Sequence, residues 1–121
     1  MALRRKREGP RITLPTAAVL RLMLQDPTGS FYGLKLAQES GFPSGTIYPI
    51  LARLEAADWV QSYWEQEDAA VLERPRRRMY QMTGAGAQAA RAALSTAQQA
   101  LGIPASDIPT PVHPQVQLGM P

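Results

Sequence analysis

The hydrophobic pattern of this sequence changes from helical to strand-like spacing near residue 59, and that change most limits the folds it can adopt. Apolar residues first recur at i, i+3, i+4 and i+7, as on one buried helix face: Ile47, Ile50, Leu51 and Leu54. Over residues 59–67 the pattern becomes strand-like, and a second strand is expected over residues 77–82. Residues 68–76 lie between them, contain Pro75 and form a loop too long for a tight turn. A helix followed by a long-looped hairpin is therefore predicted.

Turn and cap signals place three further helices. Their expected bounds are residues 15–25, residues 31–40 and residues 84–101. Ser30 is the expected N-cap of the second helix, Gly41 ends that helix, and Thr83 caps the last one. The order helix, helix, helix, strand, loop, strand, helix predicts a mainly α fold with a small β-hairpin. This is a winged helix-turn-helix plus a C-terminal dimerisation helix.

Pro49 has no backbone N–H, so it is expected within about the first turn of the third helix, which opens at Ser44 or Thr46. This start leaves Thr46, Tyr48 and Arg53 off the buried stripe and free to face a partner. Two interpretations of Tyr48 stay open: a surface residue, or an aromatic ring packed between helices. Ser44 is either an N-cap alone or an N-cap that also touches the partner.

Positive charge gathers in two clusters, although the formal net charge is only +3. One cluster lies at the N-terminus and the other precedes the second strand: Arg4, Arg5, Lys6, Arg7 and Arg11; Arg74, Arg76, Arg77 and Arg78. Two separate clusters on a small domain indicate contact with a polyanion such as DNA. The alternative is solvated charge that keeps the protein soluble.

Four parts are expected: a flexible basic arm (1–12), a winged helix-turn-helix DNA-binding domain (13–83), a C-terminal dimerisation helix (84–101) and a Pro-rich disordered tail (102–121). The chain has no cysteine, and its one histidine, His113, lies in the tail. No metal, cofactor or catalytic set is therefore expected, and an enzyme is the least expected class. No apolar run could span a bilayer and no secretory signal follows the basic N-terminus, which predicts a cytoplasmic protein without a membrane partner.

The third helix and the hairpin carry motifs by which the chain resembles the PadR family of bacterial transcriptional regulators. The matching motifs lie within residues 15–100: Tyr32-Gly33, Gly45-Thr46-Ile47-Tyr48-Pro49, Leu51, Leu54-Glu55, Trp59-Val60, Tyr80, Thr83 and Gly86. The chain departs from the commonest family pattern at Ala57-Asp58, where a glycine is frequent. The resemblance implies a homodimer whose C-terminal helices pack together, and a repressor that a small ligand often relieves. The single C-terminal helix is similar to that of the shorter family members.

The residues assigned to DNA binding come from the third helix, the wing and the arm: Ser44, Thr46, Tyr48, Pro49, Arg53, Arg74, Arg76, Arg77, Arg5 and Lys6. The helix start and Tyr48 suit a phosphate, and Arg53 suits the backbone or a guanine edge. The wing arginines suit a minor groove or phosphates, whereas Arg78 is expected on the other sheet face. Acidic neighbours can instead neutralise the hairpin: Glu65, Glu67, Asp68 and Glu73. The arm either adds sequence-tolerant contacts or only aids solubility.

The last helix repeats small apolar residues in alternating threes and fours, as a packing seam does. Together with one residue of the first helix, this seam forms the predicted dimer interface: Leu22, Ala87, Ala90, Leu94, Ala97 and Leu101. The alternative is that the last helix packs back on its own domain.

Trp59 and Trp64 are expected as packing residues of the core or hairpin, and the resemblance adds a second role as contacts for a small aromatic effector. The predicted function is a homodimeric, sequence-specific DNA-binding transcriptional regulator, a repressor at an inverted-repeat operator in double-stranded DNA. The alternative is a winged-helix module that docks a partner protein rather than DNA.

Overall fold

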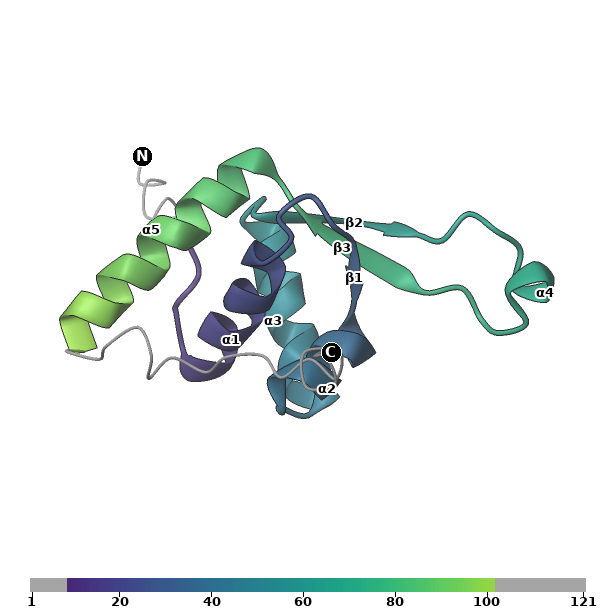
Figure 1. The fold of residues 1–121 in the computed structure, drawn as a ribbon, viewed down its shortest axis with the longest axis horizontal. Coiled ribbons are helices and arrows are strands. Elements are labelled where there is room, and N and C mark those ends of the chain that lie inside the picture. The colour runs from purple at the N-terminus through teal and green to yellow at the C-terminus, as the bar shows by residue number, and fades with distance from the viewer. Residues whose placement is uncertain (1–8, 102–121) are drawn as a thin grey trace, which may run out of the picture.

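The computed structural model describes residues 9–101 of the chain. In chain order its elements are α1 (Leu14–Leu24), β1 (Phe31–Tyr32), α2 (Gly33–Ser40), α3 (Ser44–Ala56), β2 (Val60–Trp64), α4 (Ala69–Leu72), β3 (Arg78–Met82) and α5 (Gly84–Leu101). Figure 1 shows α1, α2 and α3 grouped together, with the β2–β3 hairpin projecting to one side and α5 on the opposite side. The mainly helical fold with a small hairpin is the predicted one. The predicted tail and most of the predicted arm lie outside the described residues.

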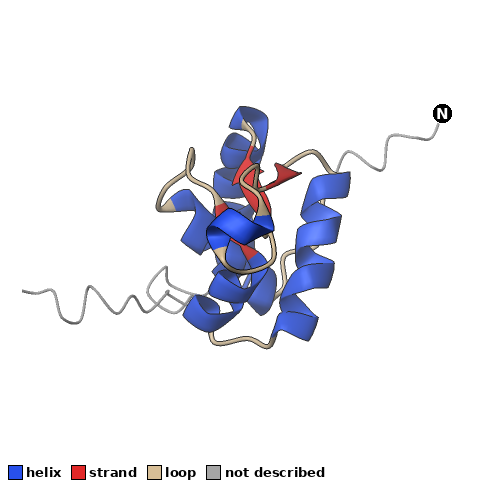
Figure 2. Cartoon of the chain, turned by 90° about the vertical axis from the view of Figure 1, so that its right-hand side faces the viewer, coloured by secondary structure: helices blue, strands red, loops and turns tan. Residues whose placement is uncertain are grey.

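One hydrophobic core joins α1, α2 and α3 and extends to the hairpin root and α5. Its largest fully buried side chains are Leu20, Leu22, Met23, Leu36, Ile47, Leu51, Leu54, Val19 and Val60. The predicted α3 stripe is confirmed, because all four of its residues are at most 2% exposed. Burial of that stripe turns the opposite face of α3 to solvent. Figure 2 looks onto the hairpin tip and shows the helices around the small sheet.

The sheet has the order β1-β3-β2, and both pairings are antiparallel. Tyr32 lies opposite Met79, so the short β1 joins the hairpin to the start of α2. The prediction that the second helix begins at Phe31 with Ser30 as its N-cap is wrong. Phe31 is extended because it pairs with Tyr80, and the Ser30 hydroxyl is hydrogen-bonded to that of Tyr63 at 2.5 Å.

The position of Pro49 in α3 also differs from the prediction. The helix begins at Ser44, so Pro49 is its sixth residue and lies beyond the first turn. A proline there removes the N–H that would bond to the carbonyl of Gly45. Gly45 is exposed, so water can satisfy that carbonyl and the helix continues. The N-cap is Pro43 and has no side-chain cap bond, so the expected capping by Ser44 is wrong as well.

The other helix ends follow the predicted signals. Gly41 ends α2 with φ 81°, a left-handed conformation that glycine adopts without strain. Thr83 caps α5, because its hydroxyl accepts a hydrogen bond from the N–H of Gly86 at 2.8 Å. The wing differs in detail: β2 ends at Trp64, and the expected loop contains the one-turn helix α4.

Candidate nucleic-acid interface

The exposed N-terminal end of α3 has backbone N–H groups that donate to no acceptor among the described residues. The carbonyl of Pro43 accepts hydrogen bonds from the N–H groups of Thr46 and Ile47, at 2.8 and 3.1 Å. Within residues 9–101, the N–H groups of Ser44 and Gly45 have no acceptor. The start of a helix also carries partial positive charge, so this end is suited to an anion.

Tyr48 lies beside this helix start and forms one wall of a hollow of about 330 Å³. The hollow lies between α3, the start of α2 and the middle of the wing, where β2 ends and β3 begins. Its other walls are Tyr32, Gly33, Leu34, Trp64, Arg76, Arg77 and Arg78. The Tyr48 side chain is 43% exposed, yet its ring lies directly against Gly33. The surface and packing interpretations of Tyr48 are therefore both correct.

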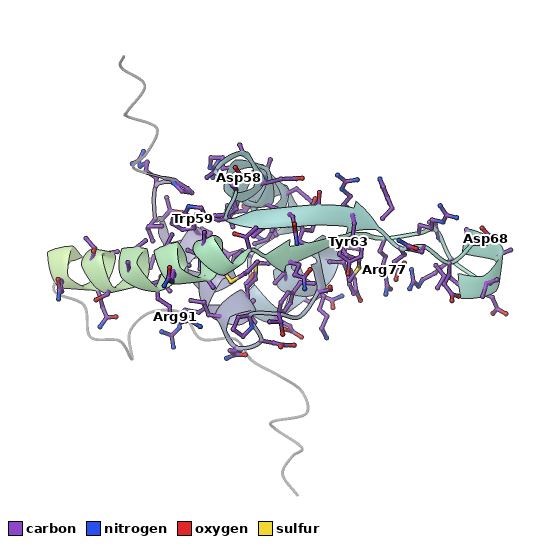
Figure 3. The ribbon with its side chains drawn as sticks, turned by 90° about the horizontal axis from the view of Figure 1, so that it is seen from above. Asp58, Trp59, Tyr63, Asp68, Arg77 and Arg91 are labelled. Atoms are coloured by element: carbon purple, nitrogen blue, oxygen red, sulfur yellow. The ribbon has the colours of Figure 1, made fainter. Side chains whose placement is uncertain are left out.

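Two wing arginines at the hollow lie with their guanidinium groups over aromatic rings. The guanidinium carbon of Arg77 lies 3.9 Å from the centroid of the Tyr32 ring, and that of Arg78 lies 5.2 Å from the centroid of a Trp64 ring. Stacking uses the face of a guanidinium and leaves its N–H groups free to donate at the edge. Arg78 contacts its cross-strand partner Trp64, whereas Arg77 contacts Tyr32, which pairs with the next residue but one, Met79; the two arginines therefore follow the expected alternation between sheet faces, although both line the hollow. Figure 3 places Arg77 part-way along the hairpin, between Trp59 at its root and Asp68 at its tip.

The other two wing arginines are paired with acidic residues. Arg74 forms two hydrogen bonds with the carboxylate of Glu65, at 2.7 and 3.0 Å. Arg76 contacts Asp68 at 3.0 Å and donates to the carbonyl of Glu67 at 2.9 Å. The alternative that acidic neighbours neutralise the hairpin thus describes Arg74 and Arg76. The side chains of Arg77 and Arg78 form no salt bridge among the described residues.

Glu65 is the centre of this distal network. Its carboxylate accepts hydrogen bonds from the Arg74 side chain and, at 2.9 Å, from the backbone N–H of Arg77. These bonds favour the charged form and lower the pKa of Glu65 from 4.5 to about 2. Glu65 thereby connects the two sides of the wing next to the arginine that stacks on Tyr32.

The remaining predicted contacts are distributed unevenly. Pro49 and Arg53 are exposed on α3 and lie one turn apart, on the side that faces away from the core. Arg5 and Lys6 lie outside the described residues. The described chain begins at Gly9, whose φ is 75° and whose backbone lies against the Trp59 ring. That position is near the C-terminal end of α3, because Trp59 follows this helix after two residues.

Comparison with known proteins identifies this arrangement. Residues 19–92 match the model of the transcriptional regulator PadR-like family. The chain belongs to this family. Members of the PadR-like family are transcriptional regulators, so the predicted family, a DNA-binding regulatory function and the exclusion of an enzyme are confirmed.

Solved structures show the same fold. A PadR family transcriptional regulator from Eggerthella lenta DSM 2243 is 22% identical, with a TM-score of 0.55 over 74% of this chain and 80% of that one. A transcriptional regulator from Clostridium thermocellum is 20% identical, with a TM-score of 0.58 over 73% and 84%. A transcriptional regulator homologue from Pyrococcus horikoshii OT3 is 15% identical, with a TM-score of 0.57 over 72% and 79%. No curated protein sequence matches the chain.

The two tryptophans of this PadR-like protein do not share a site. Trp59 is half-buried against the core, and its backbone lies under Gly86 at the start of α5. Trp64 is 55% exposed and lies at the far end of β2, beside Arg78. The interpretation as a core packing residue therefore holds for Trp59, whereas Trp64 is a wall of the hollow.

Most of the predicted dimer seam lies inside the PadR-like monomer. The residues at most 8% exposed are Leu22, Ala87, Ala90 and Leu94. They belong to the core because α5 packs on α1, which is the alternative left open from the sequence. Their assignment as a dimer interface is wrong for this reason. Ala97 is half-exposed, and the side chain of Leu101 lies outside the described part of the chain.

Sequence reasoning missed four walls of the hollow: Tyr32, Gly33, Leu34 and Arg78. The Tyr32-Gly33 pair stood out as a family motif but received no role. The signal that could have found it is a tyrosine before a glycine at a predicted helix start, a position where a small residue allows close approach. Within residues 9–101 no helix has the length and apolarity to cross a membrane, and no cluster of ligand side chains suits a metal.

Proposed function

We propose that this chain is a cytoplasmic, homodimeric and sequence-specific repressor that binds an inverted-repeat operator. The observation that carries the proposal is the hollow between α3 and the middle of the wing, where Tyr48, Arg77 and Arg78 come together. Tyr48 comes from α3 and the two arginines from the wing, and the helix start beside them has two amides without an acceptor among the described residues. Such a set is suited to the sugar-phosphate backbone of DNA.

The phosphate contacts would come from the middle of the wing and from the start of α3. Because Arg77 and Arg78 stack on rings, their guanidinium edges can donate to phosphate oxygens in a fixed orientation. The Tyr48 hydroxyl can donate to the same strand. Arg74 and Arg76 are occupied by Glu65 and Asp68, so their assigned DNA contacts would require these ion pairs to open.

The base sequence of the operator would be read by the exposed face of α3 in a major groove. Thr46 and Pro49 lie on its first turns, and Arg53 follows in the last turn. Arg53 has no partner among the described residues, so its guanidinium can donate both N–H groups to a guanine edge. Ser44 completes the helix start as a phosphate contact. Arg5 and Lys6 would add contacts to the backbone that do not depend on sequence.

Two copies of the chain would join through α5. The helix lies on the opposite side of the molecule from the wing (Figure 1), so pairing there leaves both hollows open. Among the described side chains of the predicted seam, Ala97 is half-exposed, and its small size would let a second helix approach closely. In such a dimer two α3 helices enter successive major grooves, which requires half-sites about 10 bp apart or a multiple.

A small aromatic ligand would relieve repression near the root of α5. Trp59 supports this location because it is half-buried and contacts the first turn of that helix. The test is quenching of tryptophan fluorescence by a panel of aromatic compounds in a Trp64→Phe variant, which retains Trp59 alone. Quenching that saturates supports the site, and no quenching across the panel overturns it.

Selection of genomic DNA fragments on the purified full-length protein, followed by sequencing, tests the function. A recurrent palindrome is expected, and it provides the operator for affinity measurements. Tyr48→Ala and Arg77→Ala should each weaken operator binding while the thermal unfolding transition remains. Unchanged binding in both variants would overturn this interface.

One observation favours protein docking as a second function. The distal wing, residues 65–76, carries four acidic and two basic residues, and Val71 at its tip is 67% exposed. A negative apolar tip does not suit phosphates but does suit a protein surface. Recovery of random fragments in the selection experiment would favour this function over the repressor.

A further inference from the structure

Gly33 and Tyr48 approach each other more closely than any other side chain would allow. Gly33 is the first residue of α2 and is buried. A Cβ built on its backbone would lie 2.5 Å from Cζ and 2.8 Å from the hydroxyl oxygen of Tyr48. Both distances are below those found between a real Cβ and a neighbouring atom. The Tyr48 ring therefore occupies the space that a side chain at position 33 would need.

Backbone geometry does not explain this glycine. Among the described glycines, the left-handed region is occupied by Gly9 and Gly41, and Gly33 is not one of them. An alanine could adopt the backbone conformation of Gly33, and alanine is the better helix former. Gly33 is therefore needed because it leaves room for the Tyr48 ring, and not because its backbone conformation requires a glycine.

A side chain at position 33 would change the hollow by displacing the Tyr48 ring. The group that a Cβ would meet is the ring of Tyr48, which is 43% exposed and attached through rotatable bonds. An alanine would therefore turn the ring outward, whereas α2 and the core would keep their places. The hydroxyl would leave its position against Gly33, and the hollow that Tyr48 shares with the wing arginines would change shape.

We infer that Gly33 is a positioning residue that holds the Tyr48 ring, and through it the Tyr48 hydroxyl, in place for the DNA backbone. This inference rests on the proposed function for its consequence, but its structural part can be tested without DNA. Gly33 itself does not need to touch the nucleic acid. Its effect acts through Tyr48.

A double-mutant cycle separates positioning from a merely structural role. The variants are Gly33→Ala, Tyr48→Ala and their combination, each measured for thermal stability and for affinity to the selected operator. Gly33→Ala alone should lower operator affinity by about tenfold, the loss expected when one hydrogen bond of about 1.4 kcal/mol is misplaced. Combined with Tyr48→Ala, the same substitution should cause no further loss of affinity and should raise the melting temperature, because the clash is gone.

The matched control is Gly84→Ala at the start of α5. A Cβ there meets nothing within 4 Å, so the substitution removes a glycine from a helix without a clash. It should leave operator affinity unchanged. An equal loss of affinity from Gly33→Ala with and without Tyr48, or no loss in either background, overturns the inference.

The two proposals fail in different ways. Absence of operator binding by the unmodified protein would overturn the proposed function, while the stability cycle would still decide whether Gly33 holds the ring. Additive stability effects of Gly33→Ala and Tyr48→Ala would overturn the positioning role even if the protein binds its operator. The Tyr48→Phe variant adds a check: Gly33→Ala should remain destabilising there, because the ring is retained.

Discussion

The guanidinium carbon of Arg77 lies 3.9 Å from the centroid of the Tyr32 ring. Arg77 comes from the wing, and Tyr32 comes from the short strand that leads into α2. The contact therefore connects the two parts of the molecule between which the hollow lies. It holds a charged group over a ring instead of leaving it mobile in solvent.

The first prediction concerns the charge of Arg77. Arg77→Ala should lower operator affinity and reduce the slope of log affinity against log salt by about 1 per protomer, because one phosphate contact is lost. Titrations of labelled operator at several salt concentrations measure both quantities. Arg91→Ala is the control, since Arg91 is exposed on α5 away from the wing (Figure 3). Equal losses in the two variants would mean that only overall positive charge matters.

The second prediction concerns the ring beneath Arg77. Tyr32→Phe retains an aromatic face and should bind operator as the unmodified protein does. Tyr32→Leu removes that face and should weaken binding about two- to fivefold, the range expected for an exposed cation–π contact. The same operator titration measures the effect. Equal affinity of the phenylalanine and leucine variants would contradict a role for the stack.

The third prediction is a pH dependence caused by Glu65. Its pKa is lowered to about 2 in the folded protein, from an ordinary value of 4.5. A lowered folded pKa means that the stabilisation is present above pH 4.5 and is lost as pH falls towards 2. The difference in melting temperature between the unmodified protein and Glu65→Gln should therefore shrink over that interval. A constant difference would show that the Arg74 and Arg77 bonds to Glu65 do not depend on its charge.

The fourth prediction separates core from interface. Leu22→Ala should lower the free energy of unfolding by about 2–5 kcal/mol, because Leu22 is buried within one chain. Ala97→Arg should leave that free energy nearly unchanged and should lower the dimer fraction, measured by light scattering over a range of concentrations. A variant Leu22→Ala that dissociates without destabilisation would restore the interface predicted from the sequence.

The sequence predicted the elements whose cause is local. The stripe of α3 follows from helical spacing alone, and the cap by Thr83 and the turn at Gly41 follow from the chemistry of single residues. The arrangement of helices and wing followed from the same signals. The prediction that Tyr48 lies at the surface was correct because Tyr48 is not part of the buried stripe of its own helix.

The errors came from contacts between distant residues. Phe31 is a strand residue because it pairs with Tyr80, and no residue near Phe31 in the sequence indicates that pairing. Likewise, a pattern of threes and fours in α5 predicts a seam but not whether the neighbour is α1 or a second chain. The wing charges were undecided for the same reason, since the choice between free and paired arginines depends on where Glu65 and Asp68 lie.

The contact between Gly86 and Trp59 has a consequence for the proposed dimer. A Cβ at Gly86 would overlap the Trp59 carbonyl, and main chain cannot rotate away as a side chain can. The angle at which α5 leaves the wing is therefore constrained at Gly86 and at Thr83, whose N–H donates to the same carbonyl at 3.0 Å. In a dimer joined by two copies of α5, that angle determines the separation of the two α3 helices. The length of DNA between the two half-sites would then depend on Gly86, a glycine far from either groove.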